Sequence, residues 1–318
     1  MQIPDLLGHS AATGAGELDR GLVLHRAGLE VAAAIGDGVL RVGGPYRTPD
    51  PRTLTRLRPL LENAVDTAVE TVRWISGFDV PESELDIPLL TLDDPMPGPA
   101  ARGLARYPAD GGVGVLVSNG LGFPLGDFEA FISRPRGAKA TLTGPLGRNA
   151  LCGRLLRPAA RDAATRAGLT AAERNPYRCG LIRAVELVHA LEEATALNGG
   201  YEPPDPGRVT RLEPGPGRGF AAAQSPAGLL YQRYDLLADG TVGAVRLIGP
   251  DELNRTAVEL DLRRAERTAR RRDPAIAQDR LAAVRAEPTH NYEPWDTGPA
   301  RSGTNGPDRA AHPAGPYR

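Results

Sequence analysis

The sequence is poor in lysine, in cysteine and in long apolar runs, and each shortage narrows the classes of protein that it can encode. Lys139 is the one lysine among 38 basic residues. We interpret this as the codon bias of a GC-rich genome, and it favours pairing with carboxylates, which guanidinium groups bind in bidentate fashion. Cys152 and Cys179 are the only cysteines. Two thiols exclude a disulfide framework and are typical of a reducing compartment, so we expect a cytoplasmic protein.

Membrane and nucleic-acid proteins are also disfavoured. No apolar run approaches the ~18–20 residues that a membrane-spanning helix needs. The first residues, "MQIPDLLGHSAATGAGELDRG", have neither a basic segment nor an apolar segment of the kind found in signal peptides. The formal net charge is −1, whereas nucleic-acid binding rests on many uncompensated basic side chains. At 318 residues the chain is long enough to bury a substantial core.

Metal-binding and nucleotide-binding motifs are absent from the sequence. The histidines form no HxxxH, HxH or His-Cys cluster with the spacing of metal ligands. His189 precedes Glu193 by four residues, and we interpret these two as a structural pair within one helix. We expect both cysteines to be buried core thiols. The glycines of "GGVGVLVSNGLG" precede a strand rather than a helix, and "GPGRGF" is predicted to be a turn. The five histidines are His9, His25, His189, His290 and His312.

Helical periodicity dominates the chain and predicts a mainly α fold of the α+β class. Apolar residues recur at the i, i+3, i+4, i+7 spacing of a half-buried helix. Asn175 and Pro176 are favourable start signals for the strongest of these helices, and Gly77 and Asn198-Gly199-Gly200 are stop signals. The predicted helices cover residues 18–35, 57–75, 127–132, 154–169, 175–197 and 251–272. The apolar face of the helix predicted over residues 18–35 consists of Leu22, Leu24, Ala27, Leu29, Val31 and Ala34. That of the helix predicted over residues 175–197 consists of Leu181, Ala184, Val185, Val188, Leu191 and Leu197.

A few short strands complete the prediction. Residues 81–112 are rich in Pro and Gly and are expected to be loop, with a short strand at 87–92. Residues 113–118, which follow, are expected to be a strand. A β-hairpin is expected within residues 227–250, because two β-rich runs flank Asp239-Gly240. Residues 302–318 lack apolar periodicity and are expected to be a disordered tail behind a domain of residues 1–301.

Six segments, in order along the chain, resemble the large-subunit family of nickel–iron hydrogenases, especially its cytoplasmic, cofactor-coupled branch. The likeness extends over about residues 3–301, and the resemblance implies a large-subunit-like fold with a helical core. The segments are "RVGGPYRTPD", the helix ending "ETVRWISGFD", "YPADGGVGVLVSNGLGFPLGDFEAFI", "LTGPLGRNALCGRLLRPAA", "NPYRCGLIRAVELVHALEEATALNGGYEPPDP" and "SPAGLLYQRYDLLADGTVGAVRLIGP".

The family's metal ligands have no counterparts in this sequence. Members of the family hold nickel and iron between thiolates, which are soft donors, from an R-x-C-x-x-C motif and a D-P-C-x-x-C-x-x-H motif. "MQIPDLLG" resembles a segment downstream of the first motif. In "THNYEPWDTGPAR", which resembles the second, Glu293-Pro294 stands for Asp-Pro. Trp295 and Gly298 replace the two cysteines, and Arg301 replaces the histidine. An indole donates only through N–H and glycine has no side chain, so neither binds a metal.

A catalytic segment of the family has changed as well. Its E-A-P-R-G sequence corresponds here to Gln224-Ser225-Pro226-Ala227-Gly228. The resemblance implies that Gln224 replaces a glutamate and Ala227 replaces the arginine implicated in splitting or forming hydrogen. Gln232 stands where a histidine is common. Loss of the charged pair removes a proton-handling carboxylate and a cation beside the metals. We therefore predict no nickel–iron centre, no cofactor and no catalytic residue.

Two functions remain open. The first is an inert large-subunit homologue that binds a partner, such as an iron–sulfur small subunit, a genuine large subunit or a maturation factor. The alternative is a hydrogenase-type oxidoreductase subunit whose centre is completed by another chain or serves other electron-transfer chemistry, by analogy with the quinone site of respiratory complex I.

A cavity at the former metal site distinguishes these two functions. A redox role needs space with ionisable groups facing it, and Glu186 and Arg183 are candidates for such a lining. A scaffold would fill the space, since an empty cavity costs on the order of 24 cal/mol per Å3. Trp295 either fills part of the old site or lies in a frayed tail.

Overall fold

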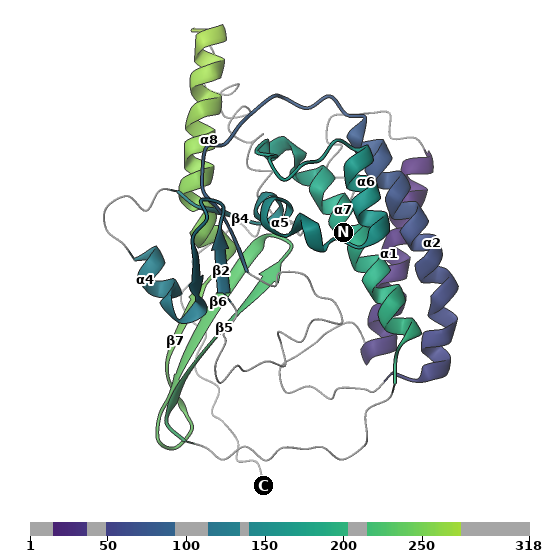
Figure 1. Ribbon diagram of the computed structural model, residues 1–318, viewed down its shortest axis with the longest axis horizontal. Coiled ribbons are helices and arrows are strands. Elements are labelled where there is room, and N and C mark those ends of the chain that lie inside the picture. The colour runs from purple at the N-terminus through teal and green to yellow at the C-terminus, as the bar shows by residue number, and fades with distance from the viewer. Residues whose placement is uncertain (1–14, 37–48, 93–113, 134–139, 203–214, 275–318) are drawn as a thin grey trace, which may run out of the picture.

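The computed structural model describes residues 15–36, 49–92, 114–133, 140–202 and 215–274 (Figure 1). A helical bundle of α1, α2, α6 and α7 lies beside a region of short strands, and α5 lies between the two. The helices are α1 (Ala15–Gly36), α2 (Pro51–Ser76), α4 (Phe128–Ile132), α5 (Pro145–Cys152), α6 (Pro158–Arg166), α7 (Cys179–Gly199) and α8 (Pro250–Arg272). The strands are β1 (Leu89–Leu92), β2 (Gly114–Val117), β3 (Gly122–Pro124), β4 (Leu142–Thr143), β5 (Gly217–Ser225), β6 (Gly228–Leu236) and β7 (Val242–Ile248).

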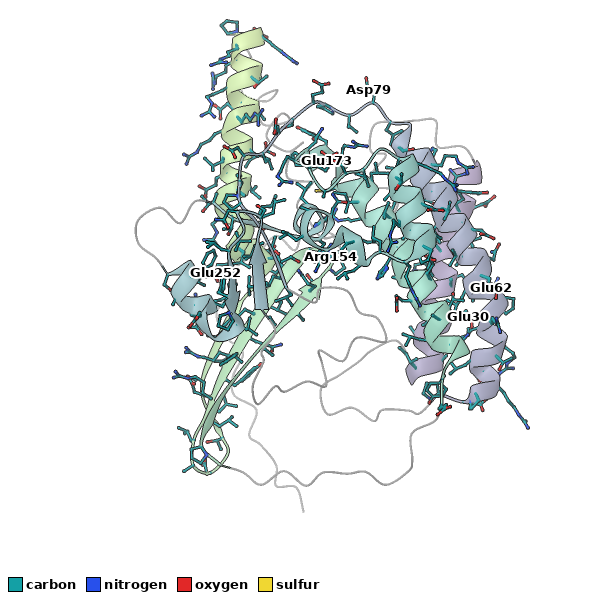
Figure 2. The ribbon with its side chains drawn as sticks, in the orientation of Figure 1. Glu30, Glu62, Asp79, Arg154, Glu173 and Glu252 are labelled. Carbon is teal, nitrogen blue, oxygen red and sulfur yellow. The ribbon has the colours of Figure 1, made fainter. Side chains whose placement is uncertain are left out.

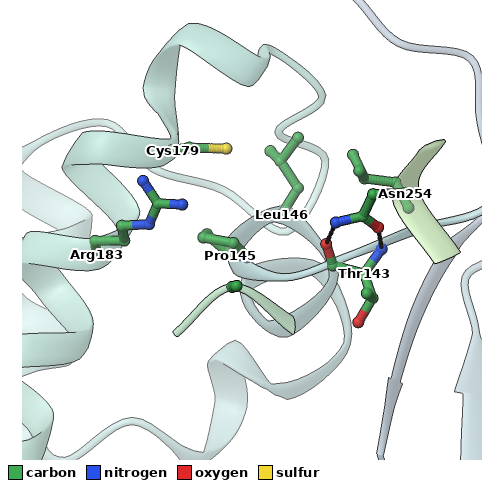
Figure 3. Close-up of a pocket in the computed structure, with 8 residues that line it drawn as sticks. Thr143, Pro145, Leu146, Cys179, Arg183 and Asn254 are labelled. Atoms are coloured by element: carbon green, nitrogen blue, oxygen red, sulfur yellow. Dashed lines mark hydrogen bonds between the residues drawn. The ribbon is translucent and has the colours of Figure 1, made fainter. Parts of the chain in front are cut away.

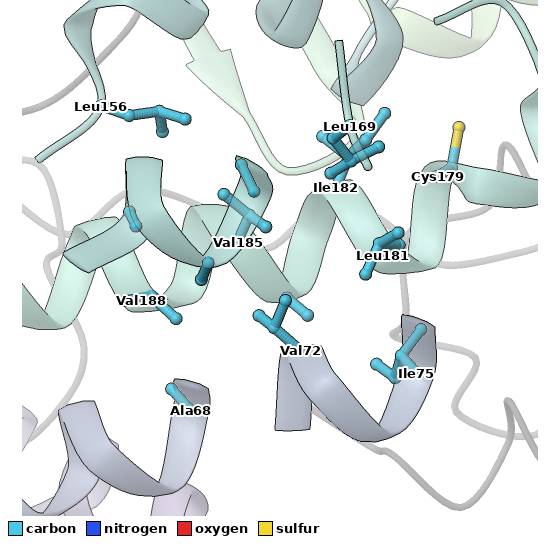
Figure 4. Packing of buried hydrophobic residues seen from close by; sticks show 14 of the residues in the cluster. Ala68, Val72, Ile75, Leu156, Leu169, Cys179, Leu181, Ile182, Val185 and Val188 are labelled. Carbon is cyan, nitrogen blue, oxygen red and sulfur yellow. The ribbon is translucent and has the colours of Figure 1, made fainter. Parts of the chain in front are cut away.

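Helices α2 and α7 form the centre of the bundle. The Asp50 carboxylate caps α2 by accepting a hydrogen bond from Thr53 N at 3.1 Å, and Gly77 ends the helix as predicted. Ala68, Val72 and Ile75 of α2 face the apolar side of α7 (Figure 4). Each fully buried Val or Leu side chain contributes roughly 1.5–3 kcal/mol. Charged residues such as Glu30 and Glu62 lie on the outward sides of α1 and α2 (Figure 2).

Two helices begin later in the structure than the sequence predicted. Asn175 caps a 3-10 turn, Pro176–Arg178, by accepting a hydrogen bond from Tyr177 N at 3.0 Å, and α7 follows this turn. The helix expected over 154–169 is wrong in extent, because α6 begins only at Pro158. Proline cannot continue a helix without losing a backbone hydrogen bond, but it suits a first position. The Glu192 carboxylate of α7 caps α6 by accepting from Ala159 N and Ala160 N at 3.0 and 2.9 Å.

The apolar face predicted for α1 is wider than the buried one. Leu24 and Ala27 are buried, whereas Leu22 and Leu29 are more than half exposed. Within the described chain α1 packs along α2, so only a narrow side of α1 is covered. Leu197 of α7 is likewise exposed, because it lies in the last turns of its helix.

The strands form two small sheets. The first has the order β3-β2-β1-β4, with β1 antiparallel to β2 and parallel to β4. The second is an antiparallel sheet of β5, β6 and β7. The predicted hairpin is confirmed as β6 and β7, and Gly240 in its turn has a φ of 81°. The turn predicted for "GPGRGF" is wrong, since Gly217–Phe220 begin β5 and pair with β6 along their whole length.

No helix in the described segments is long and apolar enough to cross a membrane. The predicted tail, residues 302–318, and the segment that carries Trp295, Gly298 and Arg301 lie outside the described residues. The division into a domain of residues 1–301 and a tail therefore stays a prediction.

Candidate functional site

Gln224 lies near the end of β5 and Ala227 lies in the turn between β5 and β6, and these are the two positions where the resemblance places catalytic residues. This turn approaches the junction of β4 and α5 so closely that two glycines are required. A Cβ on Gly144 would lie 2.8 Å from the Ala227 carbonyl oxygen, and one on Gly228 would lie 2.5 Å from Thr143 Cγ2. Both glycines also have positive φ values, 119° and 144°, which L side chains rarely adopt.

Arg148 of α5 anchors this turn. Its guanidinium donates to both carboxylate oxygens of Glu186 on α7, at 2.6 and 2.7 Å. It also donates to the carbonyl oxygens of Ser225 and Pro226, at 2.9 and 3.1 Å. Burial by itself would lower the pKa of Arg148, but the charge and hydrogen bonds of Glu186 raise the pKa above its usual value. The turn is therefore held by a cation that is already paired with a carboxylate.

The side chain of Gln224 bonds to the first sheet. Its Nε2 atom donates to Thr91 Oγ1 at 2.5 Å, and its buried Oε1 has no hydrogen-bond partner within the described residues. Thr143 and Asn254 join β4 to α8 by a reciprocal pair, with Thr143 N donating to Oδ1 at 2.8 Å and Asn254 Nδ2 donating to the Thr143 carbonyl at 3.1 Å. Gln232 lies further along β6, opposite Ala221, and is half-buried.

Ala227 lines a small cavity, which Figure 3 shows from close by. Cys179 and Arg183 of α7 contribute to its wall, together with Leu146 and Asn254. About 10 Å3 is available to the centres of water molecules, which is room for roughly one water. Of the two residues considered as a polar lining, Arg183 faces this cavity, whereas Glu186 is engaged by Arg148.

Both cysteines are buried and unpaired with each other, as predicted. Burial raises the pKa of Cys179 to about 12, although the neighbouring Arg183 acts in the opposite direction. The thiol of Cys179 is therefore protonated at neutral pH in this environment. Cys152 directs its sulfur toward the Leu92 carbonyl at 3.8 Å.

His189 and Glu193, interpreted from the sequence as a structural pair, interact electrostatically but bond to different groups of Arg157. The Nδ1 atom of His189 accepts from Arg157 N at 3.1 Å, and Glu193 forms an ion pair with the Arg157 guanidinium at 2.5 Å. Burial lowers the pKa of His189, although Glu193 and Glu192 partly counteract it. His189 is thus a structural acceptor at the start of α6. His25 is exposed on α1, and His9, His290 and His312 lie outside the described residues.

The described residues near the turn do not fit a nickel–iron centre. Such a centre needs several soft, deprotonated donors, whereas this region offers two guanidiniums, a carboxylate paired with Arg148 and one neutral thiol. Across the described parts of the chain, no group of three or more His, Cys, Asp or Glu side chains could hold a metal ion.

Sequence reasoning missed Arg148 and the Thr143–Asn254 pair. Arg148 is the one charged residue in "GPLGRNALCG". A single charge among apolar residues was the sequence signal that could have indicated a buried ion pair. Its partners come from segments 38 and 77 residues away along the chain, so spacing in the sequence could not identify them.

No family model and no curated protein matches this chain. Solved structures do match it. A crystal structure of an NAD+-reducing [NiFe]-hydrogenase in the H2-reduced state has a TM-score of 0.64 and 17% identity, and the match covers 86% of this chain and 66% of that one. The Ni-Fe-Se hydrogenase of D. vulgaris Hildenborough has a TM-score of 0.50 and 14% identity, over 77% and 62% of the two chains. That of Desulfomicrobium baculatum has a TM-score of 0.50 and 12% identity, over 78% and 63%.

This chain thus spans less than two thirds of the length of these hydrogenases. Identities below 25% show the fold alone. The fold implied by the resemblance of the six segments is therefore confirmed, together with the mainly helical α+β class. The described part of the chain has the fold of a nickel–iron hydrogenase large subunit.

Proposed function

We propose that this chain is a degenerate large-subunit homologue without a nickel–iron centre, acting as a non-catalytic binding subunit of a hydrogenase-type redox complex. Its partner would be an iron–sulfur small subunit or another subunit of that complex, in the cytoplasm. The observation that carries this proposal is the small size of the cavity beside Ala227, which has room for about one water molecule.

Chemistry at the β5–β6 turn would need both space and free ionisable groups. Arg148 and Glu186 are the cation and the carboxylate beside this turn, and they are bound to each other. The remaining donors of Arg148 bind the carbonyl oxygens of the turn. Ala227 offers a methyl group at the position that the resemblance assigns to an arginine. These features support a turn that serves as structure rather than as a reaction site.

The alternative is a hydrogenase-type oxidoreductase subunit, with hydrogen or quinone and electron-transfer chemistry, whose centre another chain completes. It requires a cavity that admits a substrate and faces ionisable side chains. Arg183 provides one such side chain, but the space beside it has room for about one water molecule, which is too small for a quinone. This supports the binding role over the catalytic one.

The metal content of the natural complex tests the proposal. We would purify the tagged chain from its own host with its bound partners, and measure nickel and iron per chain by elemental mass spectrometry. The control is the same purification from cells that express the tag alone. We expect no nickel above that background once the partners are removed, and no hydrogen-dependent dye reduction. Near-stoichiometric nickel retained by the separated chain would contradict the proposal, and Cys152, Cys179 and His290 would then be the first residues to mutate.

A further inference from the structure

The sheet of β5, β6 and β7 has two chemically different faces. All four charged residues of its strands, Arg218, Arg233, Asp235 and Arg246, lie on one face, because Arg218 is opposite Asp235 and Arg233 is opposite Arg246 in the antiparallel register. Salt bridges among them and with α4 confirm this placement, since Arg233 contacts Glu129 at 2.9 Å. The base of the same face packs on the core through Leu229, Tyr231 and Ile248.

The opposite face, which we name the outer face, carries no charge. It consists of Ala221 and Ala223 of β5, Gln232, Tyr234 and Leu236 of β6, and Val245 and Leu247 of β7, which pair across the strands in register. Tyr234, Leu236, Val245 and Leu247 are 38–54% exposed. Antiparallel sheets that face water normally place polar side chains on the open side. Here both faces of the distal part of the described sheet are exposed, and the charges lie on one face only, because Arg218 and Arg246 are 63% and 46% exposed on the charged face, so the outer face is open to solvent without a charged side chain.

The extent of the outer face indicates the kind of partner that would cover it. Strands are about 4.8 Å apart and rise about 3.3 Å per residue, so three strands along the nine residues of β6 present on the order of 400 Å2. Standard stable interfaces bury about 800 Å2 on each partner. Two copies stacked through this face alone would therefore fall short of a stable dimer. The absence of charged side chains instead matches the centre of a larger interface, where charged residues are depleted.

We propose that the outer face is the apolar centre of the interface with the partner subunit, a different polypeptide that presents an uncharged apolar surface to β6 and β7. This inference rests on the proposed function, because it assigns the docking surface of the binding subunit. The partner's contact extends beyond the sheet, where polar residues form the rim.

Charged substitutions on the two faces of one strand test this inference. Val245→Lys places a charge on the outer face. Ala244→Lys is the matched control, since Ala244 is an exposed neighbour on β7 that points to the charged face opposite Asp235. Each tagged variant would be purified from the host, and its partner quantified by size-exclusion chromatography with light scattering. Thermal unfolding of the isolated chain would be measured in parallel.

We expect Val245→Lys to reduce partner retention roughly tenfold or more, because a charge buried without a counter-ion costs at least 1.4 kcal/mol. Ala244→Lys should retain the partner, and neither variant should change the unfolding temperature of the isolated chain.

Retention by both variants would overturn the inference while leaving the proposed function intact. A wild-type chain that binds no partner would contradict the proposed function itself. Two further outcomes would overturn the inference. If Val245→Lys dissociated a homo-oligomer, a second copy of the chain would cover the outer face. If the isolated Val245→Lys chain unfolded at a lower temperature than wild type, the chain itself would cover that face.

Discussion

Arg148 and Glu186 form a bidentate ion pair that joins α5 to α7, with N–O distances of 2.6 and 2.7 Å. The guanidinium is nearly inaccessible, with 5% of its side chain exposed, and its remaining donors bind the turn between β5 and β6. One cation thus fixes α5, α7 and the β5–β6 turn, beside the positions where the resemblance places catalytic residues. In this chain the ion pair holds α5, α7 and the turn together.

Arg148→Ala should destabilise the chain by about 3–5 kcal/mol, because the change leaves Glu186 and two carbonyl oxygens without their donor. The measurement is chemical denaturation at pH 7. Arg58→Ala is the control, since Arg58 belongs to an exposed pair with Glu62 on α2 and should change the free energy of unfolding by less than about 1 kcal/mol. The double variant Arg148→Met with Glu186→Leu should recover part of the loss, because no unpaired charge remains. Equal losses for Arg148→Ala and Arg58→Ala would contradict this account.

The sequence predicted the regular elements well for local physical reasons. Helices α2 and α7 follow from their apolar spacing, from the stop signal at Gly77 and from Asn175, which caps the 3-10 turn that leads into α7. These signals act within a few residues. The hairpin of β6 and β7 follows from Asp239-Gly240, whose backbone preference is also local. The strand β5 was missed because two of its first three residues are glycines and it contains three alanines. Both residue types have low strand propensity, and the strand is held by its pairing with β6.

The candidate site was predicted only in part. The resemblance located the turn at Gln224 and Ala227, but the contacts that define its environment join residues far apart in the sequence. Arg148 reaches Ser225 across 77 residues, and Thr143 reaches Asn254 across 111. Such contacts depend on how helices and sheets pack, which spacing in a sequence does not reveal. The segment with Trp295 lies outside the described residues, so its role stays a prediction.

Gly228→Ala should destabilise the chain by more than about 1 kcal/mol. Its φ of 144° is unfavourable for alanine, and the added Cβ would lie 2.5 Å from Thr143 Cγ2. Gly28→Ala provides the opposite case, because Gly28 is exposed within α1 and nothing lies within 4 Å of its added Cβ. That variant should gain about 0.5–1 kcal/mol. Thermal unfolding of both variants against wild type measures the difference, and a stabilising Gly228→Ala would show that the turn does not approach β4 so closely.

His189 should make the chain less stable in mild acid. Its folded-state pKa is lowered from 6.5 by burial, so below about pH 6.5 the unfolded chain binds a proton that the folded chain does not. Stability contributed by neutral His189 is therefore complete above that pH and is lost as the pH falls below it. Denaturation midpoints between pH 5 and 7.5 measure this loss. His189→Gln should flatten the dependence in that window even if it lowers stability throughout, and an unchanged slope would assign the effect to other groups.

Ala227→Arg restores the residue that the resemblance places at this position and tests whether the turn retains room for chemistry. The cavity beside Ala227 has space for about one water molecule, so an arginine side chain would overpack the junction of β4, α5 and α7. It would also add a cation next to Arg183. We expect a loss of about 1–3 kcal/mol or more in the free energy of unfolding and no gain of hydrogen-dependent dye reduction. Ala223→Arg, on the exposed outer face of β5, is the control for the added side chain and should leave stability nearly unchanged. If Ala227→Arg folded as stably as Ala223→Arg, the turn would have space for a functional side chain, and the catalytic alternative would regain support.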